Sequence, residues 1–306
     1  MTNMPAISLI AVPGRRQATV DAAVEADQRG FSAIYCPSSG DALGICSSIA
    51  HLTKSIKFAT SIQPIYFQVA AQLANQASYL NEISGGRFSL GIGVSHAPAL
   101  DRVGASRGRP LSDIRQYVAD LHASDPAPGV AGAGLPPVLL ATLRDKMVDL
   151  SVEIAEGAIW ANCSLNDIPR SIARIPQQKR DAGFVVANMI PTIIDEDKEA
   201  AAAKHRKSLT GYVMLPNYRN YWKSAGYEEE MTAIEAAIAD DDLKRLPELM
   251  SDRWLSNSTL YGSAAEVRDG VTAWQEAGVT TPILVPSALK GGHLAGVQAV
   301  FDAFSS

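Results

Sequence analysis

Residues 83–98 read ISGGRFSLGIGVSHAP, and this stretch joins the end of a helix to a strand and the strand to a polar loop. The glycine pair at 85–86 is typical of a helix stop, because glycine adopts the left-handed conformation at little cost. Across 88–94, large apolar residues alternate with serine or glycine, which predicts a strand with one bulky face and one bare face. The polar pair Ser95-His96 follows. Proteins with parallel α/β sheets repeat such a unit.

The same alternation of short β-rich runs and longer helical stretches continues in both directions along the chain. Eight runs have the composition of strands, and the segments between them repeat apolar residues at helical spacing. The pattern predicts a (β/α)8 TIM barrel formed by residues 1–306 as a single domain, with a doubly wound open sheet as the competing fold. The predicted strands are 6–12, 32–37, 56–62, 88–94, 137–143, 157–162, 184–194 and 282–288.

One connection is far longer than a normal loop between a strand and a helix. It separates the last two predicted strands, and its apolar spacing is helical, most clearly in EMTAIEAAIADDDLKRLPELM at 230–250. We therefore predict a helical insertion over one end of the barrel at approximately 195–262, within the same domain.

The composition predicts a globular protein that acts on a small molecule. The chain is 47% hydrophobic and 19% charged with a formal net charge of -5, and it has no basic block, so nucleic acid and anionic membranes are disfavoured as partners. Cys36, Cys46 and Cys163 lie in apolar segments without metal-ligand spacing, which predicts buried thiols and no metal site. No signal peptide or membrane-spanning run is visible, so a cytoplasmic location is expected.

Gly91 and Gly93 carry the bare face of the strand at 88–94. One interpretation is functional, because glycine lets a flat ligand approach the backbone at the mouth of a barrel. The other is structural, because glycine also relieves crowding between neighbouring strands. The residues alone leave both open, although Ser95-His96 follows the carboxyl end of the strand, where barrel enzymes place their chemistry.

Longer motifs surround the quoted stretch and cover most of the chain. They are IKFATSIQPIYFQVAAQLANQASYL (56–80), LNEISGGRFSLGIGVSHAP (80–98), RPLSDIRQYV (109–118), PPVLLATLRDKMVDLSVEIAEGAIWAN (136–162) and GSAAEVRDGVTAWQEAGVTTPILVPS (262–287). Taken in order, they resemble the bacterial luciferase-like family of flavin- or deazaflavin-dependent oxidoreductases. The resemblance implies a (β/α)8 barrel with an insertion after the seventh strand.

The resemblance also implies a cofactor, either FMN or the deazaflavin coenzyme F-420. In the family, the third strand ends in a bulge with a non-prolyl cis peptide that presses on the middle ring of the cofactor. The matching residues are Thr60, Ser61 and Ile62, with Ser61–Ile62 as the candidate cis bond; the alternative is an ordinary strand end. Gly91 and Gly93 would leave space for the ring.

The cofactor phosphate in this family binds where the loop after the fifth strand enters its helix, a position where unpaired N–H groups attract anions. This chain departs from the commoner glycine-rich form of the loop. Asp145 could cap the helix and repel a phosphate, whereas Arg144 and Lys146 could compensate; a solvated charged helix start is the alternative. The candidate phosphate residues are Leu143, Arg144, Asp145, Lys146 and Met147.

Other candidate cofactor residues follow the predicted strands, and they are Ser38, Ser39, Asp41, Val94, Ser95, His96, Trp160 and Asn162. Some relatives carry a histidine after the second strand, but this chain has none there. His96 is the best titratable candidate for a catalytic acid or base, because its ordinary pKa of about 6.5 suits proton transfer near neutrality. A structural or merely exposed histidine is the alternative. Trp160 could line the pocket, but a core tryptophan with a satisfied N–H is the favoured interpretation.

Tyr218, Tyr221 and Trp222 lie close together within the predicted insertion. They could form a lid that closes over a substrate and excludes water, or they could form a dimer contact.

The sequence thus favours an oxidoreductase of the luciferase-like monooxygenase class that acts on a small organic substrate by hydride transfer or oxygen activation. FMN and coenzyme F-420 stay undecided, NAD(P)H is a candidate reductant, and a homodimer or higher homo-oligomer is expected. The alternatives are a flavin-binding barrel without turnover and an unrelated TIM-barrel lyase or aldolase. An aldolase would need an inward lysine at a strand end, which the eight predicted strands lack.

Overall fold

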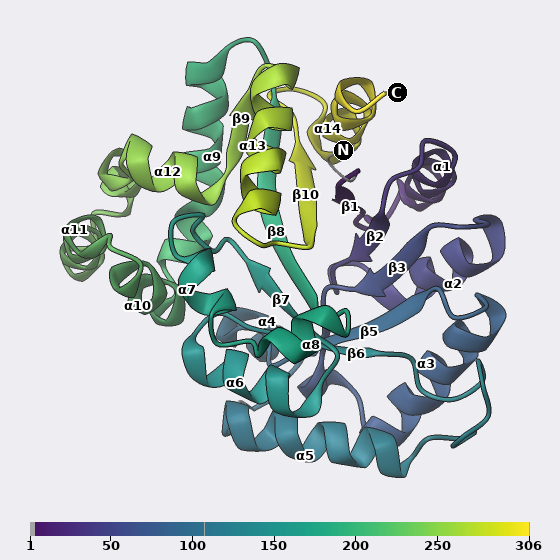
Figure 1. Ribbon diagram of the computed structural model, residues 1–306. Helices are drawn as coiled ribbons and strands as arrows, with labels where there is room; N and C mark the ends of the chain where they lie inside the picture. The colour runs from purple at the N-terminus through teal and green to yellow at the C-terminus, as the bar shows by residue number, and fades with distance from the viewer. Residues whose placement is uncertain (1–3, 107, 306) are drawn as a thin grey trace. The chain divides into compact units, whose positions relative to one another are not determined.

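The computed structural model describes residues 4–106 and 108–305. Within these ranges the contacts divide the chain into two compact units (Figure 1). Unit 1 comprises residues 4–160 and 174–187, and unit 2 comprises residues 161–173 and 188–305. The predictions of one domain and of an insertion at 195–262 stay predictions.

Unit 1 contains a run of parallel strands that pair in chain order. Each strand is joined to the next by a segment that contains a helix, so their carboxyl ends lie at the same edge of the sheet. The order along this run is β1-β2-β3-β5-β6-β7, and the two-residue β4 pairs with β5. The strands are β1 (Ala6–Ser8), β2 (Ala33–Cys36), β3 (Lys57–Thr60), β4 (Gln63–Pro64), β5 (Phe88–Gly93), β6 (Val138–Ala141) and β7 (Gly157–Ala161).

The helices of unit 1 bury the apolar stripes that the sequence predicts. In α3, Leu73, Ala77 and Leu80 are buried, and Figure 1 shows α1, α2, α3 and α5 on the outer side of the strands. The helix stop is confirmed, because α3 ends before two glycines with positive φ angles. The elements are α1 (Arg16–Gln28), α2 (Ala42–Leu52), η1 (Ile65–Phe67), α3 (Ala70–Ile83), α4 (Ala97–Arg102), α5 (Pro110–Ala123), α6 (Asp145–Ile154) and α8 (Gln177–Asp181).

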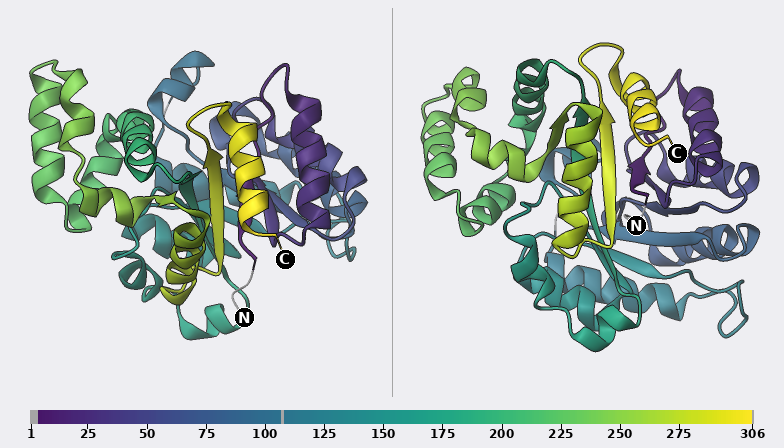
Figure 2. Two further views of the ribbon diagram at one scale, coloured as in Figure 1. Left: turned by 90° about the horizontal axis from the view of Figure 1, so that it is seen from above. Right: turned by 45° about the horizontal axis from the view of Figure 1, so that its top comes forward.

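Unit 2 is mainly helical around three strands. β8 (Val185–Ile194), which begins in unit 1, pairs in parallel with β9 (Leu260–Gly262) and also pairs with β10 (Thr281–Ser287). Figure 2 shows α14 (Gly292–Ala303) beside β10. The sequence did not predict β9, which is only three residues long. The other elements are α7 (Ile168–Ile172), α9 (Lys198–Val213), α10 (Pro216–Ser224), α11 (Glu228–Ala239), η2 (Leu243–Leu249), α12 (Asp252–Ser258) and α13 (Ala264–Glu276).

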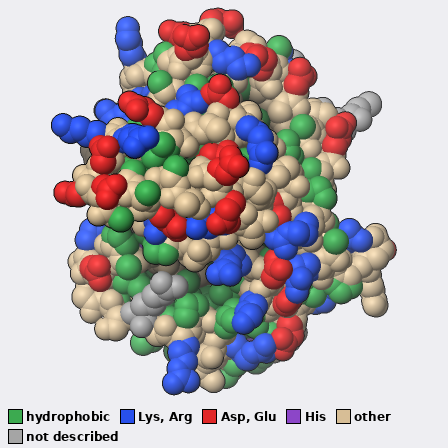
Figure 3. All heavy atoms as spheres, turned by 90° about the vertical axis from the view of Figure 1, so that its left-hand side faces the viewer, with side chains coloured by type: hydrophobic (Ala, Val, Ile, Leu, Met, Phe, Trp, Pro, Cys, Tyr) green, Lys and Arg blue, Asp and Glu red, His purple; other side chains and the backbone are tan. Residues whose placement is uncertain are grey.

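The fold class is that of a (β/α)8 TIM barrel, as predicted. Each of the eight predicted strand segments contains a strand of the structure. The three cysteines are buried and free, also as predicted. Among the described residues, no helix is both long and apolar enough to cross a membrane. On the face shown in Figure 3, acidic and basic side chains are interspersed, and this mixture does not favour a polyanionic partner.

Candidate active site

The carboxyl end of β3 is held by hydrogen bonds to the strands on either side. The Ser61 amide donates a hydrogen bond to the Cys36 carbonyl at 2.8 Å, and the Thr60 hydroxyl donates one to the Gly91 carbonyl at 2.7 Å. The peptide bond between Ser61 and Ile62 is cis, at the position that the family resemblance implies. The structure therefore brings the predicted residues of the third and fourth barrel strands into direct contact.

The two glycines of β5 are explained by close packing. A Cβ atom on Gly91 would lie 2.0 Å from the Thr60 carbonyl oxygen, and one on Gly93 would lie 2.7 Å from the Ala141 Cβ. Both distances are far below van der Waals contact. Of the two interpretations that the sequence left open, these contacts support relief of crowding. The expectation that the bare face opens space for a ligand is corrected to this extent, because the neighbouring strands already occupy the positions next to both Cα atoms.

Strained backbone conformations gather in the loops that follow the strands. Four described residues other than glycine have a positive φ, and three of them are predicted site residues: Asp41 at 147°, Ser95 at 61° and Asn162 at 54°. Such conformations cost on the order of 1–3 kcal/mol each and cluster at active sites and ligand clamps. Asp41 follows β2, Ser95 follows β5 and Asn162 follows β7, so each lies after a strand's carboxyl end.

Several polar side chains at strand ends in unit 1 are buried without a hydrogen-bond partner among the described residues. The hydroxyls of Ser8, Ser61 and Thr142 lie at or just after the ends of β1, β3 and β6, and the Trp160 indole N–H lies in β7. The satisfied N–H expected for a core Trp160 is therefore wrong, although the side chain is fully buried. A buried polar atom without a partner is costly, so a ligand or water is expected to satisfy it.

Ser8 and Thr142 were missed in the sequence. Each is a lone hydroxyl residue at the carboxyl end of an otherwise apolar strand, and that pattern could have identified both.

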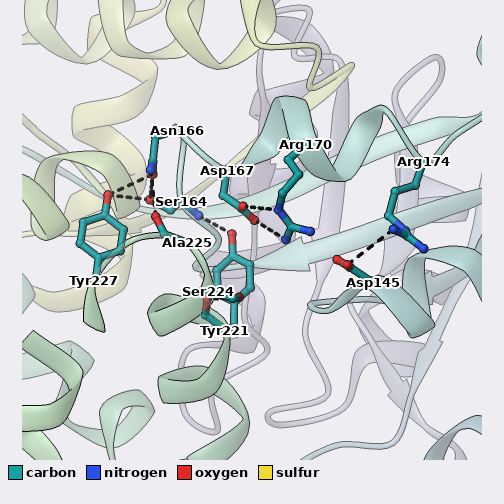
Figure 4. Close-up of polar contacts among 10 residues, drawn as sticks. All are labelled: Asp145, Ser164, Asn166, Asp167, Arg170, Arg174, Tyr221, Ser224, Ala225 and Tyr227. Atoms are coloured by element: carbon teal, nitrogen blue, oxygen red, sulfur yellow. Dashed lines mark hydrogen bonds and ion pairs between the residues drawn. The ribbon is translucent and has the colours of Figure 1, made fainter. Parts of the chain in front are cut away.

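The start of α6 differs from the capping role considered for its acidic residue. No side chain caps this helix, so Asp145 does not act as the N-cap. Its carboxylate instead lies 3.5 Å from Arg174, and Arg174 makes two further contacts to Asp149, at 2.6 and 2.8 Å. Figure 4 shows the Arg174–Asp145 contact. Arg174 thereby offsets the negative charge at the helix start. Of the other predicted phosphate residues, Arg144 and Lys146 are exposed, and Leu143 and Met147 are half-buried.

The remaining candidates of unit 1 are accessible to different extents. Ser38 and His96 are half-buried, Val94 is half-buried, and Ser39 is exposed. His96 immediately precedes α4, and its side chain provides no cap for that helix. The structure thus places His96 at the predicted end of its strand, and its catalytic role stays a prediction.

The three aromatic residues predicted as a lid or dimer contact are buried inside unit 2. Tyr218, Tyr221 and Trp222 are 4%, 1% and 0% exposed. The Trp222 indole donates to the Asn162 carbonyl at 3.2 Å. Figure 4 shows the Tyr221 hydroxyl, which accepts a hydrogen bond from the Ser164 amide at 2.9 Å. Both expectations are corrected, because these side chains anchor α10 to the loop after β7 and present no free surface. Asn162 is likewise buried in this anchor.

This anchor forms part of a larger buried polar cluster. The Ser164 hydroxyl lies 2.6 Å from the Asn166 side-chain oxygen and 3.0 Å from the Tyr227 hydroxyl, and the Asn166 amide donates to the Ala225 carbonyl. Burial raises the pKa of Tyr221 well above its ordinary value, so its phenol stays protonated. The cluster therefore has a structural function in unit 2.

Comparisons with known proteins agree with the fold. A family model described as luciferase-like monooxygenase matches residues 7–281. The 5,10-methylenetetrahydromethanopterin reductase of Methanolobus tindarius is 24% identical over 284 residues, which cover 83% of this chain and 86% of that protein.

Solved structures with the same fold include enzymes of two cofactor types. The coenzyme F420-dependent tetrahydromethanopterin reductase of Methanopyrus kandleri has a TM-score of 0.73 at 17% identity and covers 98% of this chain and 97% of its own. The oxygenating constituent of 3,6-diketocamphane monooxygenase from Pseudomonas putida, solved with FMN, has a TM-score of 0.62 at 17% identity, with coverages of 99% and 96%.

Proposed function

The chain belongs to the luciferase-like monooxygenase family, and we propose that within it the protein is an oxidoreductase that uses coenzyme F-420 for hydride transfer to or from a small organic substrate. Two comparisons support this choice over oxygen activation. The relative from Methanolobus tindarius is a reductase. The F420-dependent reductase structure has a higher TM-score against this chain, 0.73, than the FMN monooxygenase structure, 0.62. A monooxygenase that uses FMN is the second candidate, and the likeness to the Pseudomonas putida structure favours it.

The observation that carries the proposal is the strained backbone at Asp41 and Ser95, two predicted cofactor residues of unit 1. The loops that contain them follow two different strands and carry a conformational cost at the end of the sheet where barrel enzymes bind their ligands. Glycine adopts a positive φ at little cost, so a residue other than glycine at these positions retains that cost.

The residues of this chain fit a planar, phosphorylated cofactor. The buried hydroxyls of Ser61 and Thr142, which have no partner among the residues that the structure describes, would hydrogen-bond to polar atoms of such a group. The uncapped start of α6 offers N–H groups to a phosphate, and Arg174 offsets the carboxylate of Asp145 beside it. His96 would hold or transfer a proton at the substrate. When bound, the deazaflavin or flavin ring supplies the two-electron chemistry.

The proposal predicts which cofactor the purified protein binds. Coenzyme F-420 and FMN are titrated separately into the full-length protein, and binding is followed by the change in cofactor fluorescence. Saturable binding of F-420, followed by loss of its visible absorbance with a reduced donor substrate, supports hydride transfer. Binding of FMN alone, with substrate-dependent oxygen consumption, supports the second candidate. If neither cofactor binds, both are wrong.

Two further expectations belong to this proposal. A cytoplasmic location is supported by three buried cysteines that remain free. A homodimer or higher homo-oligomer stays a prediction, and a light-scattering mass at twice the 32.5 kDa of one chain, or more, tests it.

A further inference from the structure

Two of the three cysteines of this chain lie next to each other in unit 1. Cys36 is the last residue of β2, and Cys46 lies in the second turn of α2, which packs against β2. Both side chains are fully buried, and the thiol of Cys46 forms a hydrogen bond with the thiol of Cys36. Cys163, the third cysteine, belongs to unit 2. The fold therefore brings two thiols from different elements of unit 1 into contact.

The two thiols of this pair are suited to different steps of an oxidation. Burial raises the pKa of the Cys46 thiol well above its ordinary value, and the neighbouring Cys36 and Asp41 raise it further. Cys46 therefore keeps its proton at neutral pH. Because the thiolate is the form that attacks an oxidant, Cys46 is poorly suited to react first. It is placed to react second, with a sulfur that has already been oxidised at Cys36.

A small oxidant has a short route to the pair. A pocket of about 620 Å³ is lined by Leu43, Gly44 and Ser47 of α2, among other residues of unit 1. These three residues flank Cys46 in the sequence, so the pocket reaches the same part of α2 that carries the buried thiol. Local opening of the first turns of α2 would expose both sulfurs to a molecule in the pocket.

We propose that Cys36 and Cys46 form an intramolecular disulfide when the folded protein meets hydrogen peroxide. The Cys36 sulfur attacks one peroxide oxygen, the O–O bond breaks, and the other oxygen leaves as water with the thiol proton, so that Cys36 becomes a sulfenic acid. The Cys46 sulfur then attacks the Cys36 sulfur, the S–O bond breaks, and the hydroxyl group leaves as a second water with the Cys46 proton. The two thiols thus lose two electrons and two protons, and the peroxide is reduced to two waters.

This disulfide would close the loop that follows β2. Residues 36–46 include Ser38, Ser39 and Asp41, which are predicted cofactor residues. A cross-link limits the conformations that are open to the segment it closes. Oxidation would therefore act on this loop directly. The proposal does not rest on the proposed function, because the disulfide forms between two thiols of the chain and needs no cofactor.

Mass spectrometry of the full-length, cofactor-free protein tests the proposal. The folded protein is treated with hydrogen peroxide, denatured, alkylated with N-ethylmaleimide and cleaved before aspartate residues, a reaction that cuts at Asp41 and so separates Cys36 from Cys46. We expect these two peptides to stay joined and only Cys163 to be alkylated, whereas dithiothreitol before alkylation should restore all three thiols. Three alkylated thiols after peroxide, a disulfide to Cys163, or sulfinic acids without a cross-link would overturn the proposal.

Two serine variants identify the reacting sulfurs. Cys46→Ser removes the second thiol of the pair, so peroxide should leave a sulfenic acid on Cys36, which dimedone traps, and no disulfide. Cys163→Ser is the matched control and should form the same disulfide as the wild type. A disulfide that persists in Cys46→Ser, or one that is lost in Cys163→Ser, contradicts the proposal. If Cys46→Ser does not fold, Cys163→Ser decides, because its only thiols are those of the pair.

Discussion

Gly91 determines how closely β3 and β5 can approach at the site. Its Cα faces the Thr60 carbonyl oxygen, and the Thr60 hydroxyl bonds to the Gly91 carbonyl in return. The atom nearest to an added Cβ would be the Thr60 carbonyl oxygen. Because this oxygen belongs to the backbone, no rotamer change could relieve the collision. The cost must therefore appear as a shift of a strand.

Gly91→Ala should lower the free energy of unfolding by about 3 kcal/mol, because overpacking forces backbone movement. The measurement is urea denaturation followed by circular dichroism. Gly211→Ala is the control, since no atom lies within 4 Å of the added Cβ and alanine favours the helix α9. A Gly91→Ala variant as stable as the wild type would show that the strands can separate without cost.

The ion pair between Arg174 and Asp145 leads to a second prediction. Arg174→Gln leaves the Asp145 charge without this partner beside the start of α6, and should weaken binding of the phosphorylated cofactor about threefold to tenfold. The double variant Asp145→Asn with Arg174→Gln removes the repelling charge too, and should bind about as tightly as the wild type. Fluorescence titration measures all three.

Arg180→Gln is the matched control for this comparison, because Arg180 is exposed on α8 and contacts Gln177. If the double variant binds as weakly as Arg174→Gln, the charge of Asp145 is not the reason for the loss.

Between elements, α9 and β9 are joined by a buried histidine. His205 is 2% exposed, and its Nε2 lies 3.1 Å from the Leu260 carbonyl oxygen. Burial lowers the pKa of His205 to about 4, and the hydrogen bond to Leu260 opposes this only in part. The imidazole is therefore neutral in the folded protein at neutral pH.

This histidine should make folding stability depend on pH. Between about pH 6.5 and pH 4 the unfolded chain binds a proton at His205 that the folded chain does not, so stability falls as the pH is lowered through this range. The loss from this residue should reach about 3 kcal/mol at pH 4. Urea denaturation at pH 7 and pH 4.5 measures it.

His205→Gln supplies the control, because glutamine does not titrate in this range. Its stability should change less between the two pH values than that of the wild type. An equal change in both proteins would show that other groups cause the acid sensitivity.

At the scale of the whole molecule, ligand binding and folding are linked. A cofactor that binds only the native state at one hundred times its dissociation constant should raise the free energy of unfolding by about 2.7 kcal/mol. Thermal unfolding with F-420 and with FMN, each at that concentration, measures the effect. If neither compound raises the unfolding midpoint, the proposed cofactor site is contradicted.

Local patterns in the sequence were enough to predict the fold class, and they also predict the edge of the sheet at which the site is expected. Alternating strand and helix periodicities are local properties of the chain, and polar residues after each strand mark the carboxyl end. The same patterns located the helix stop at 85–86 and the start of α6, whereas Ser61–Ile62 was expected only from the resemblance to the luciferase-like family. The three residues of β9 carry too little periodicity to be found in this way.

Only the tertiary structure decided what each candidate side chain contacts. Tyr218, Tyr221 and Trp222 have the composition of a lid, but their neighbours Asn162 and Ser164 come from a distant part of the chain. Burial depends on such distant neighbours, and a periodicity within one segment does not contain them. For the same reason the crowding at Gly91 and the Arg174 partner of Asp145 emerge only when strands and helices are packed together.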